Sequence, residues 1–313
     1  MKLKRKNKII ILFVSLISLN LFPIFFIAIP LNFKGSWKYF FGDDFEDLFK
    51  IPVAISNDGN YIVTGGPQDK IYFFKSSSSK PIWSYRFNHA IMDVDISADG
   101  SYIAVATEID YKLYLFHSSS SNPLWSSVTG TSLGDVDLSY NGDYIVAAAD
   151  QLYLFEKSSE IPLWTFVDDS SLNTAKISSD GNWIVASDYN DIFYFGKSSS
   201  TPLWSYAHSN TILDYSSDGE FIILGGTDGL ILLNSAVESP KTALWTYGPM
   251  YITDVGISSD GDEIVAGRSA GAFLFFENKI STPSFTGDTF SRGIVAMSPE
   301  GTYFVIGTYS GYL

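Results

Sequence analysis

Cysteine is absent from all 313 residues of the chain. This excludes disulfide bonds, a zinc or haem site with a cysteine ligand, and a lipid-modified cysteine at a membrane. Histidine is almost absent too: the chain has only His89, His117 and His208. His89 and His208 lie in predicted loops of separate segments. We expect them to be solvated, because two such histidines rarely make a metal site alone.

The residue patterns of common catalytic sites give no support for an enzyme. The sequence has no Ser-His-Asp spacing and no glycine-rich phosphate loop. Two GxSxG strings occur, at 130–134 and 267–271, but no helix is predicted after either, and a nucleophile elbow needs a strand-to-helix turn. No motif therefore indicates nucleophilic catalysis or phosphate binding.

Basic residues are scarce outside the N-terminus. The chain has 20 Lys and Arg against 34 Asp and Glu, which gives a net charge of −14. Residues 1–34 hold six of the basic residues and no acidic one, so the remainder carries 14 basic and 34 acidic residues, a net charge of −20. Because so acidic a surface repels phosphate backbones, we expect no nucleic-acid partner.

An uncharged apolar segment of 21 residues, 9–29, follows the basic residues 1–8. As a helix it would be about 31 Å long, close to the ~30 Å thickness of a bilayer core. No small-x-small cleavage site ends the segment, which favours a transmembrane signal-anchor; a cleaved signal peptide is the alternative. The basic residues before it predict a cytoplasmic N-terminus and a single-pass protein of the cell membrane, with residues 35–313 on the extracytoplasmic side.

Seven copies of one unit make up the rest of the chain. A Ser-x-Asp-Gly turn, with small variations, marks each copy. Its glycine recurs every 38 to 42 residues, at Gly59, Gly100, Gly142, Gly181, Gly219, Gly261 and Gly301. A second marker is the tryptophan of "PIW", "PLW" or "ALW", which Phe285 replaces in the sixth copy: Trp83, Trp125, Trp164, Trp204 and Trp245.

Each copy divides into four short strands, which in the second copy are "MDVDI", "YIAVAT", "KLYLF" and "PLWSS". Asp-Gly favours a tight hairpin, because glycine accepts a positive φ and aspartate caps the turn. Apolar residues alternate along the first strand, as at Val94 and Ile96, which fits burial between neighbouring sheets. Four strands in about 40 residues predict an all-β fold, a seven-bladed β-propeller, after one N-terminal transmembrane helix.

The two ends of the repeat region are incomplete in complementary ways. The segment "GSWKYFFG", 35–42, matches the fourth-strand pattern, with Trp37 at the tryptophan position, but lacks three preceding strands. The seventh copy has its first strands but no tryptophan strand. We expect strand 35–41 to close the last blade, so that the propeller spans 35–313. The alternative is that the chain is a fragment of a longer protein.

The Ser-x-Asp-Gly hairpin followed by an apolar strand resembles WD-repeat propellers over residues 50–313. The second half of the unit is similar to the quinoprotein-type, pyrroloquinoline-quinone-like repeat. In that repeat a tryptophan comes eight residues after the loop begins, as from Lys75 to Trp83. Both resemblances imply a propeller, a fold that hosts unrelated functions. The vicinal cysteine pair common in quinone enzymes has no counterpart here, so a quinone cofactor is not expected.

Aspartates recur on the first strands, two or four residues before the turn serine and on the face opposite the apolar residues: Asp93, Asp95, Asp135, Asp137, Asp214 and Asp254. Carboxylates that converge on a central channel can bind a hard cation such as calcium, and Asp93, Asp135 and Asp254 are the candidate ligands. Alternatively, they accept hydrogen bonds from backbone N–H groups of adjacent blades or line a wet channel. Lys176 holds an equivalent position in the fourth copy and would offset their charge.

The recurring tryptophan is expected to be a repeated packing element, although exposed aromatic residues can also grip sugars or peptides. The serine runs at 76–79 and 118–121 predict solvated loops. We expect any binding site on the rim formed by the loops after the tryptophan strands, near 86–92, 128–135, 167–174, 207–212 and 247–254.

The favoured function is a binding or assembly scaffold for a protein or an envelope polymer, anchored in the membrane by residues 9–29. The alternative is an enzyme of quinoprotein-like or lyase type with a cation in the central channel. Such an enzyme needs a convergent acid–base or metal set, and the sequence does not supply one beyond the aspartates.

Overall fold

The computed structural model describes residues 52–66, 69–209, 212–235, 243–277, 279–288, 293–297, 301 and 303–308, together with the backbone of 8–9, 12–13 and 27–28. This part of the chain consists of strands, turns and loops, and none of its elements is a helix long and apolar enough to cross a membrane. Of the predicted signal-anchor 9–29, the structure describes only residues 9, 12–13 and 27–28. The predicted closing strand 35–41 lies outside the described residues.

Two compact units divide the chain. The larger unit is Phe41–His208, and the smaller unit combines Met1–Phe40 with Ser209–Leu313.

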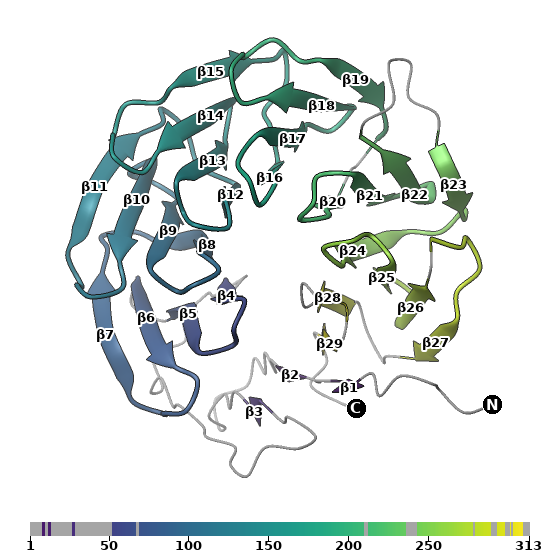
Figure 1. Cartoon of the computed structure of the whole chain (residues 1–313), viewed down its shortest axis with the longest axis horizontal. Helices are drawn as coiled ribbons and strands as arrows, with labels where there is room; N and C mark the ends of the chain where they lie inside the picture. Colours follow the sequence, from purple (N-terminus) through teal and green to yellow (C-terminus); the bar gives the residue numbers. More distant parts are fainter. Residues whose placement is uncertain are drawn as a thin grey trace. The chain divides into compact units, whose positions relative to one another are not determined.

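Four antiparallel sheets form the larger unit, and each sheet is one repeat whose four strands follow in sequence order (Figure 1). Within this unit the first strands lie on the inner side and the fourth strands on the outer side (Figure 1). The first two sheets are β4 (Val53–Ile55), β5 (Tyr61–Gly66), β6 (Lys70–Lys75) and β7 (Pro81–Arg86), then β8 (Ile91–Ile96), β9 (Tyr102–Thr107), β10 (Lys112–His117) and β11 (Pro123–Val128). The next two are β12 (Asp135–Leu138), β13 (Tyr144–Ala148), β14 (Gln151–Glu156) and β15 (Trp164–Val167), then β16 (Thr174–Ile177), β17 (Trp183–Ser187), β18 (Asp191–Gly196) and β19 (Trp204–Ala207).

The smaller unit contains two further four-stranded sheets of the same kind and one sheet from the last repeat. The four-stranded sheets are β20 (Ile212–Tyr215), β21 (Phe221–Gly226), β22 (Gly229–Asn234) and β23 (Ala243–Tyr247), then β24 (Ile252–Ile257), β25 (Glu263–Arg268), β26 (Ala272–Glu277) and β27 (Phe285–Asp288). In the last repeat β28 (Gly293–Met297) pairs with β29 (Tyr303–Thr308), and β1 (Lys8–Ile9) adds to β29 in parallel. Two short strands, β2 (Leu12–Phe13) and β3 (Ile27–Ala28), pair with each other. The six four-stranded sheets confirm the predicted all-β repeat fold as propeller-like.

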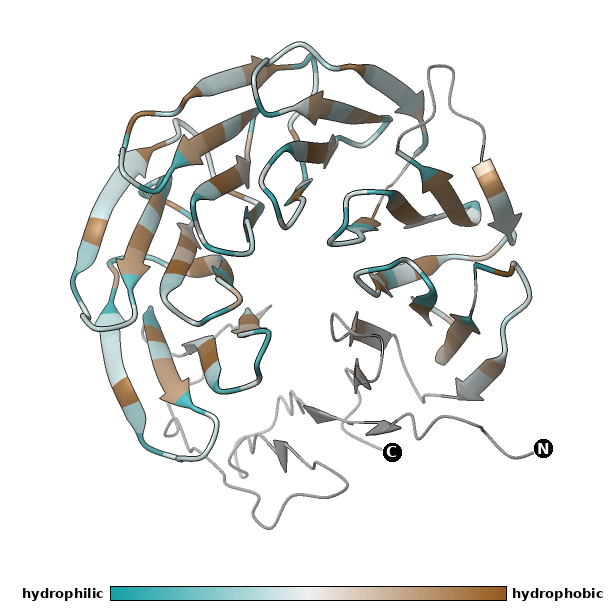
Figure 2. Cartoon of the chain, in the orientation of Figure 1, coloured by the Kyte–Doolittle hydropathy of each residue, from teal (hydrophilic) through white to brown (hydrophobic). Residues whose placement is uncertain are grey.

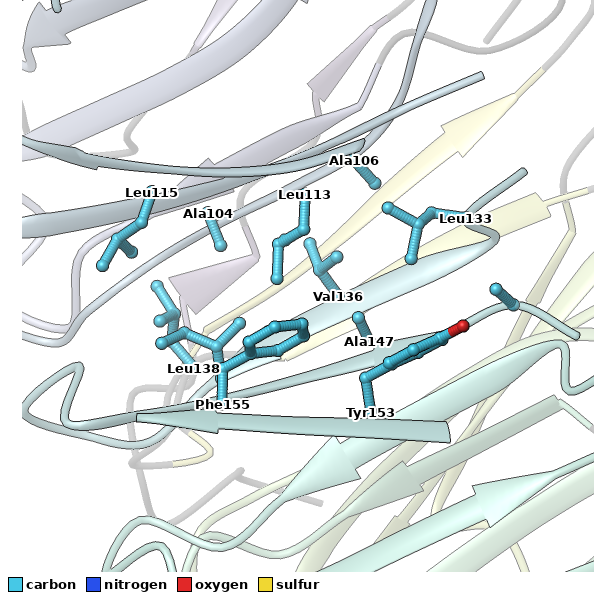
Figure 3. Close-up of a cluster of buried hydrophobic side chains, with 12 residues drawn as sticks. Ala104, Ala106, Leu113, Leu115, Leu133, Val136, Leu138, Ala147, Tyr153 and Phe155 are labelled. Carbon is cyan, nitrogen blue, oxygen red and sulfur yellow. The ribbon is translucent and has the colours of Figure 1, made fainter. Parts of the chain in front are cut away.

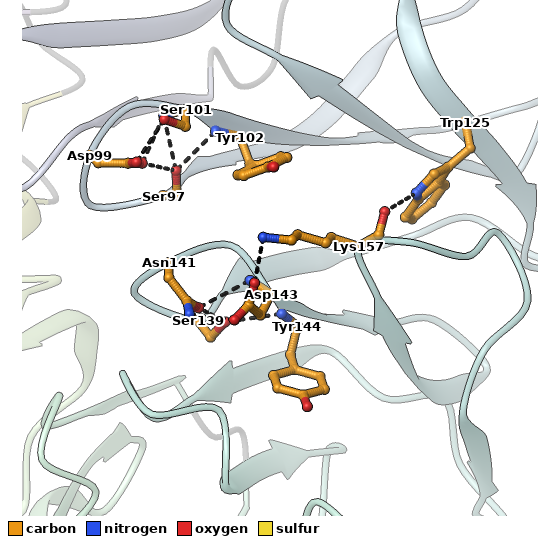
Figure 4. Close-up of polar contacts among 10 residues, drawn as sticks. All are labelled: Ser97, Asp99, Ser101, Tyr102, Trp125, Ser139, Asn141, Asp143, Tyr144 and Lys157. Carbon is orange, nitrogen blue, oxygen red and sulfur yellow. Dashed lines mark hydrogen bonds and ion pairs between the residues drawn. The ribbon is translucent and has the colours of Figure 1, made fainter.

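The Ser-x-Asp-Gly turn joins the first two strands of a repeat through its serine. Ser97 Oγ donates to Asp99 Oδ1 over 2.8 Å and accepts the N–H of Tyr102 over 2.9 Å, which links the two strands (Figure 4). Gly100 closes the turn with an N–H bond to the Ser97 carbonyl at 2.8 Å, and its φ of +73° is one that glycine tolerates best. The same two serine bonds recur at Ser56, Ser139, Ser178, Ser216 and Ser258, with Asn141 as the acceptor in the third repeat.

Apolar side chains fill the space between successive sheets. Leu113 and Leu115 of β10 belong to one buried cluster with Val136 and Leu138 of β12 and with Phe155 of β14 (Figure 3). Equivalent clusters lie between the other successive sheets within each unit. Brown apolar residues lie mainly on the inner strands of the sheets, and teal hydrophilic residues occupy most turns (Figure 2). Each fully buried leucine or phenylalanine contributes roughly 1.5–3 kcal/mol, so these layers supply most of the stability.

The first repeat departs from the predicted burial of its first strand. Val53 and Ile55 are 47% and 59% exposed, whereas the corresponding residues of the second repeat, Val94 and Ile96, are buried. First-strand apolar residues face the preceding sheet, and β4 belongs to the first sheet that the structure describes in the larger unit. No described sheet of that unit therefore covers them.

Candidate functional site

The three predicted cation ligands all accept hydrogen bonds from the backbone of the next sheet. Asp93 Oδ2 accepts the N–H of Val136 over 3.1 Å, and Asp135 Oδ2 accepts that of Ala175 over 3.0 Å. In the smaller unit, Asp254 Oδ2 accepts the N–H of Val295 over 2.8 Å. Each of these aspartates lies four residues before its turn serine, and each donor lies three residues before the next turn serine.

The aspartates two residues before the turn serine make a second set of such bonds. Asp95, Asp137 and Asp214 accept the N–H groups of Leu138, Ile177 and Ile257 over 2.8, 2.7 and 2.9 Å. A carboxylate oxygen thus bridges the first strands of neighbouring sheets. Backbone N–H groups that would otherwise lack a partner are satisfied in this way. This is the hydrogen-bonding alternative that the sequence left open.

Lys176 neutralises part of this charge in the larger unit. Its Nζ lies 3.3 Å from Asp135 Oδ2 and 3.7 Å from Asp137 Oδ1. Burial is the main factor that raises the pKa of Asp95 to about 6, and burial raises the pKa of Asp137 well above its usual range. The positive charge of Lys176 opposes both shifts, whereas neighbouring carboxylates reinforce them.

The predicted calcium site stays a prediction. Asp93 on β8 and Asp135 on β12 lie on neighbouring first strands of the larger unit, and Asp254 lies on β24 of the smaller unit. Among the residues that the structure describes, no three histidine, aspartate or glutamate side chains are grouped so that they could hold a metal ion. In each of the three predicted ligands, Oδ2 already accepts a backbone N–H of the next sheet.

In the first three repeats the tryptophan ties one repeat to the next. Trp125 Nε1 donates to the carbonyl of Lys157 over 2.8 Å (Figure 4), and its ring centroid lies 5.6 Å from that of Phe155. Trp83 and Trp164 donate in the same way to Ser118 and Lys197, both over 2.7 Å. The packing role expected for the tryptophans is therefore present, and the indole hydrogen bond is a further role that the sequence did not reveal.

The histidines do not gather into a site. His117 Nδ1 lies 2.8 Å from Ser119 Oγ at the start of a serine loop. The expectation that His208 is solvated was wrong: its side chain is only 7% exposed. It follows β19 directly, and its backbone N–H donates to the carbonyl of Asn190 in the turn before β18, which holds the residue against the sheet.

The rim formed by the loops after the tryptophan strands, which the sequence predicts to bind a partner, carries an exposed apolar patch in the second repeat. Ile109, Tyr111 and Val128 are 57%, 40% and 65% exposed, and we refer to them as the rim patch. The N–H of Thr129, next to Val128, donates to the Tyr111 carbonyl over 2.8 Å, so the turn before β10 and the loop after β11 lie side by side. Val128 thus lies in one of the predicted binding loops, 128–135, whereas Ile109 and Tyr111 lie in the adjacent turn before β10, which the prediction did not include.

Tyr111 occupies a strained backbone conformation. Its φ is +54°, which is rare for a bulky residue. In the sixth repeat Gly271 takes a similar conformation directly before the third strand, and Asp69 does so in the first. Glycine adopts this φ without steric cost, so the tyrosine side chain adds a conformational penalty at this turn.

The chain matches no protein-family model, and no curated protein is significantly similar to it.

Proposed function

We propose that the chain is a membrane-anchored, extracytoplasmic β-propeller that acts as a binding or assembly scaffold for another protein or an envelope polymer. The rim patch carries this proposal. Exposed large apolar side chains that gather on a loop rim, one of them held in a strained conformation, are typical of recognition surfaces. Tyrosine in particular brings a large contact area with little loss of conformational entropy.

The proposed location rests on the N-terminal sequence. Five basic residues within 1–8 precede the uncharged segment 9–29, and a domain with a net charge of −20 follows. Such a segment matches the bilayer core, and the basic residues favour a cytoplasmic N-terminus.

The proposed propeller has seven blades, the last completed by strand 35–41. Exposed Val53 and Ile55 support this closure, because a seventh blade placed before the first would cover them. Deletion of residues 35–42 is expected to leave a strand edge and apolar surface uncovered, and so to lower the melting temperature by several degrees or more. An unchanged melting temperature would contradict closure by this strand.

Photo-crosslinking in the membranes of the source cells tests the binding role. A photoreactive amino acid at Tyr111 or Val128 should give adducts of defined mass, and the matched sites Ser77 and Ser198, in exposed serine loops at the opposite end of the sheets, should give none. Adducts from the serine loops alone would refute binding at the predicted rim.

A high-salt wash of the same membranes tests the anchor. If residues 9–29 span the membrane, the protein should stay in the membrane pellet after the wash.

A further inference from the structure

The outer strand of the third repeat exposes an apolar edge. Over residues 161–167 exposed and half-buried side chains alternate, as in an extended chain. The exposed ones, which we call the edge stripe, are Ile161, Leu163, Thr165 and Val167. The three aliphatic side chains are 72%, 50% and 64% exposed. β15 pairs with β14 on one side, and no described strand pairs with its outer side (Figure 1), so this edge is open to a further strand.

The equivalent strands of the other repeats in the larger unit carry polar or charged residues at this edge. Exposed Lys80 and Arg86 take the positions of Ile161 and Val167 in the first repeat. The position of Ile161 is Asn122 in the second repeat and Thr201 in the fourth. Charged and polar side chains at a sheet edge keep other chains from pairing with it. The third repeat lacks this protection, so its edge is suited to accept a strand.

Carboxylates lie at both ends of the edge stripe. Glu160 comes directly before it, and Asp168 and Asp169 come directly after it. None of these three forms an ion pair with a described residue. Burial raises the pKa of Asp168, and the negative charges of Asp188 and Asp169 add to this shift. A positive charge placed beside Asp168 would therefore be attracted to it.

We propose that the edge stripe binds an extended segment of another protein, in which apolar residues alternate along the strand and lysine or arginine residues lie at the ends. The segment adds to β15 as a fifth strand of the sheet. Main-chain hydrogen bonds supply affinity in such strand addition, and the alternate side chains supply specificity. The site goes beyond the proposed scaffold function, because it lies in the third repeat and needs none of the rim patch in the second.

The same carboxylates disfavour a second copy of this chain as the occupant. In an antiparallel pair of two edge stripes, Ile161 would lie opposite Val167 of the copy, and Glu160 would lie opposite Asp168. A parallel pair would place each carboxylate beside its own counterpart. Like charges directly opposite each other on neighbouring strands are destabilising. A segment with basic ends turns this repulsion into attraction.

The peptide Lys-Val-Thr-Val-Thr-Val-Thr-Val-Lys is the probe. Its valines can lie opposite the edge stripe, and its lysines then lie opposite Glu160 and Asp168. Fluorescence anisotropy of the labelled peptide measures binding to the full-length protein in phosphatidylcholine nanodiscs, with empty nanodiscs as the blank. The same peptide with glutamate for lysine should bind about fivefold to thirtyfold more weakly. This ratio should shrink in the double variant Glu160→Gln, Asp168→Asn.

A second double variant tests the stripe itself. Ile161→Lys with Val167→Lys gives the third repeat basic residues where the first has Lys80 and Arg86. The fold should tolerate them, which an unchanged melting temperature would verify, and peptide binding should weaken by about tenfold or more. The matched control is Thr201→Lys with Ala207→Lys, which adds the same charges at equivalent exposed positions of the fourth repeat and should leave binding unchanged.

Three outcomes would overturn the proposal. The first is equal binding of the lysine and glutamate peptides. The second is binding that persists in Ile161→Lys with Val167→Lys, or that falls equally in the fourth-repeat control. The third is a dimer of the wild-type protein in sedimentation that the stripe variant abolishes, which would make a second copy the occupant. Crosslinking at the rim patch is measured separately, so failure of either site is distinguishable from failure of the other.

Discussion

Alanine in place of Gly142 is expected to destabilise the larger unit by about 2–4 kcal/mol, whereas alanine in place of Gly130 should cost only about 1 kcal/mol. Both glycines have positive φ angles, +68° and +87°, so both substitutions carry a conformational penalty. The difference lies in the neighbours. A Cβ at Gly142 would lie 2.9 Å from Cβ and from Cδ2 of Tyr102 in the preceding repeat, and a Cβ at Gly130 has no described atom within 4 Å. Because Tyr102 Cβ is fixed by the backbone of β9, the two sheets must move apart.

Denaturant unfolding of the purified variants measures this difference. The clash can be isolated with a double-mutant cycle: in the Tyr102→Gly background, which removes both Cβ and the ring, Gly142→Ala should cost no more than Gly130→Ala. Equal losses for the two single glycine variants would show that the contact between the repeats contributes nothing beyond backbone conformation.

The fold could be predicted from the sequence because its signals are local and repeated. The Ser-x-x-Gly turn, the alternation of apolar residues and the tryptophan strand recur seven, seven and five times, so a chance match at one copy does not mislead. The predicted second-copy strand "YIAVAT" coincides with β9, and "KLYLF" falls within β10. The exposure of Val53 could not be predicted, because it depends on which sheet covers β4 rather than on the strand itself.

The site was harder to predict because its chemistry depends on contacts between repeats. The sequence spacing placed Asp93 and Asp135 on the same face of their respective strands. It could not show whether their carboxylates bind a cation or accept hydrogen bonds from N–H groups of the next sheet. The structure supplies the bonds to Val136 and Ala175. The ion pair between Lys176 and Asp137 could not be predicted either. Lys176 occupies the repeat position that aspartate has in other copies, which predicts that it lies near their carboxylates but not which of them it contacts. Strain at Tyr111 had no sequence signal at all beyond a tyrosine where another repeat has glycine.

Trp125→Ala is the other substitution with a large expected effect, a loss of about 3 kcal/mol of unfolding free energy. The indole packs on Phe155 of the next repeat and donates to the Lys157 carbonyl, so the substitution leaves both a cavity and a carbonyl without its donor. Trp125→Phe keeps a smaller aromatic ring and removes the N–H, and it should cost about 1–2 kcal/mol. The difference between the two variants then reports the packing of the aromatic ring that remains.

Leu124→Ala is the matched control, because Leu124 is the preceding residue of the same strand and is half exposed. Its loss should stay within about 0.5 kcal/mol, as for most surface substitutions. The denaturant midpoints of the three variants measure these losses of stability. If Trp125→Ala does not fold, Trp125→Phe can still be compared with Leu124→Ala. Similar losses for Trp125→Ala and Leu124→Ala would mean that the tryptophan row does not join the repeats. Its regular placement would then favour the alternative, exposed aromatic residues that bind a sugar or a peptide.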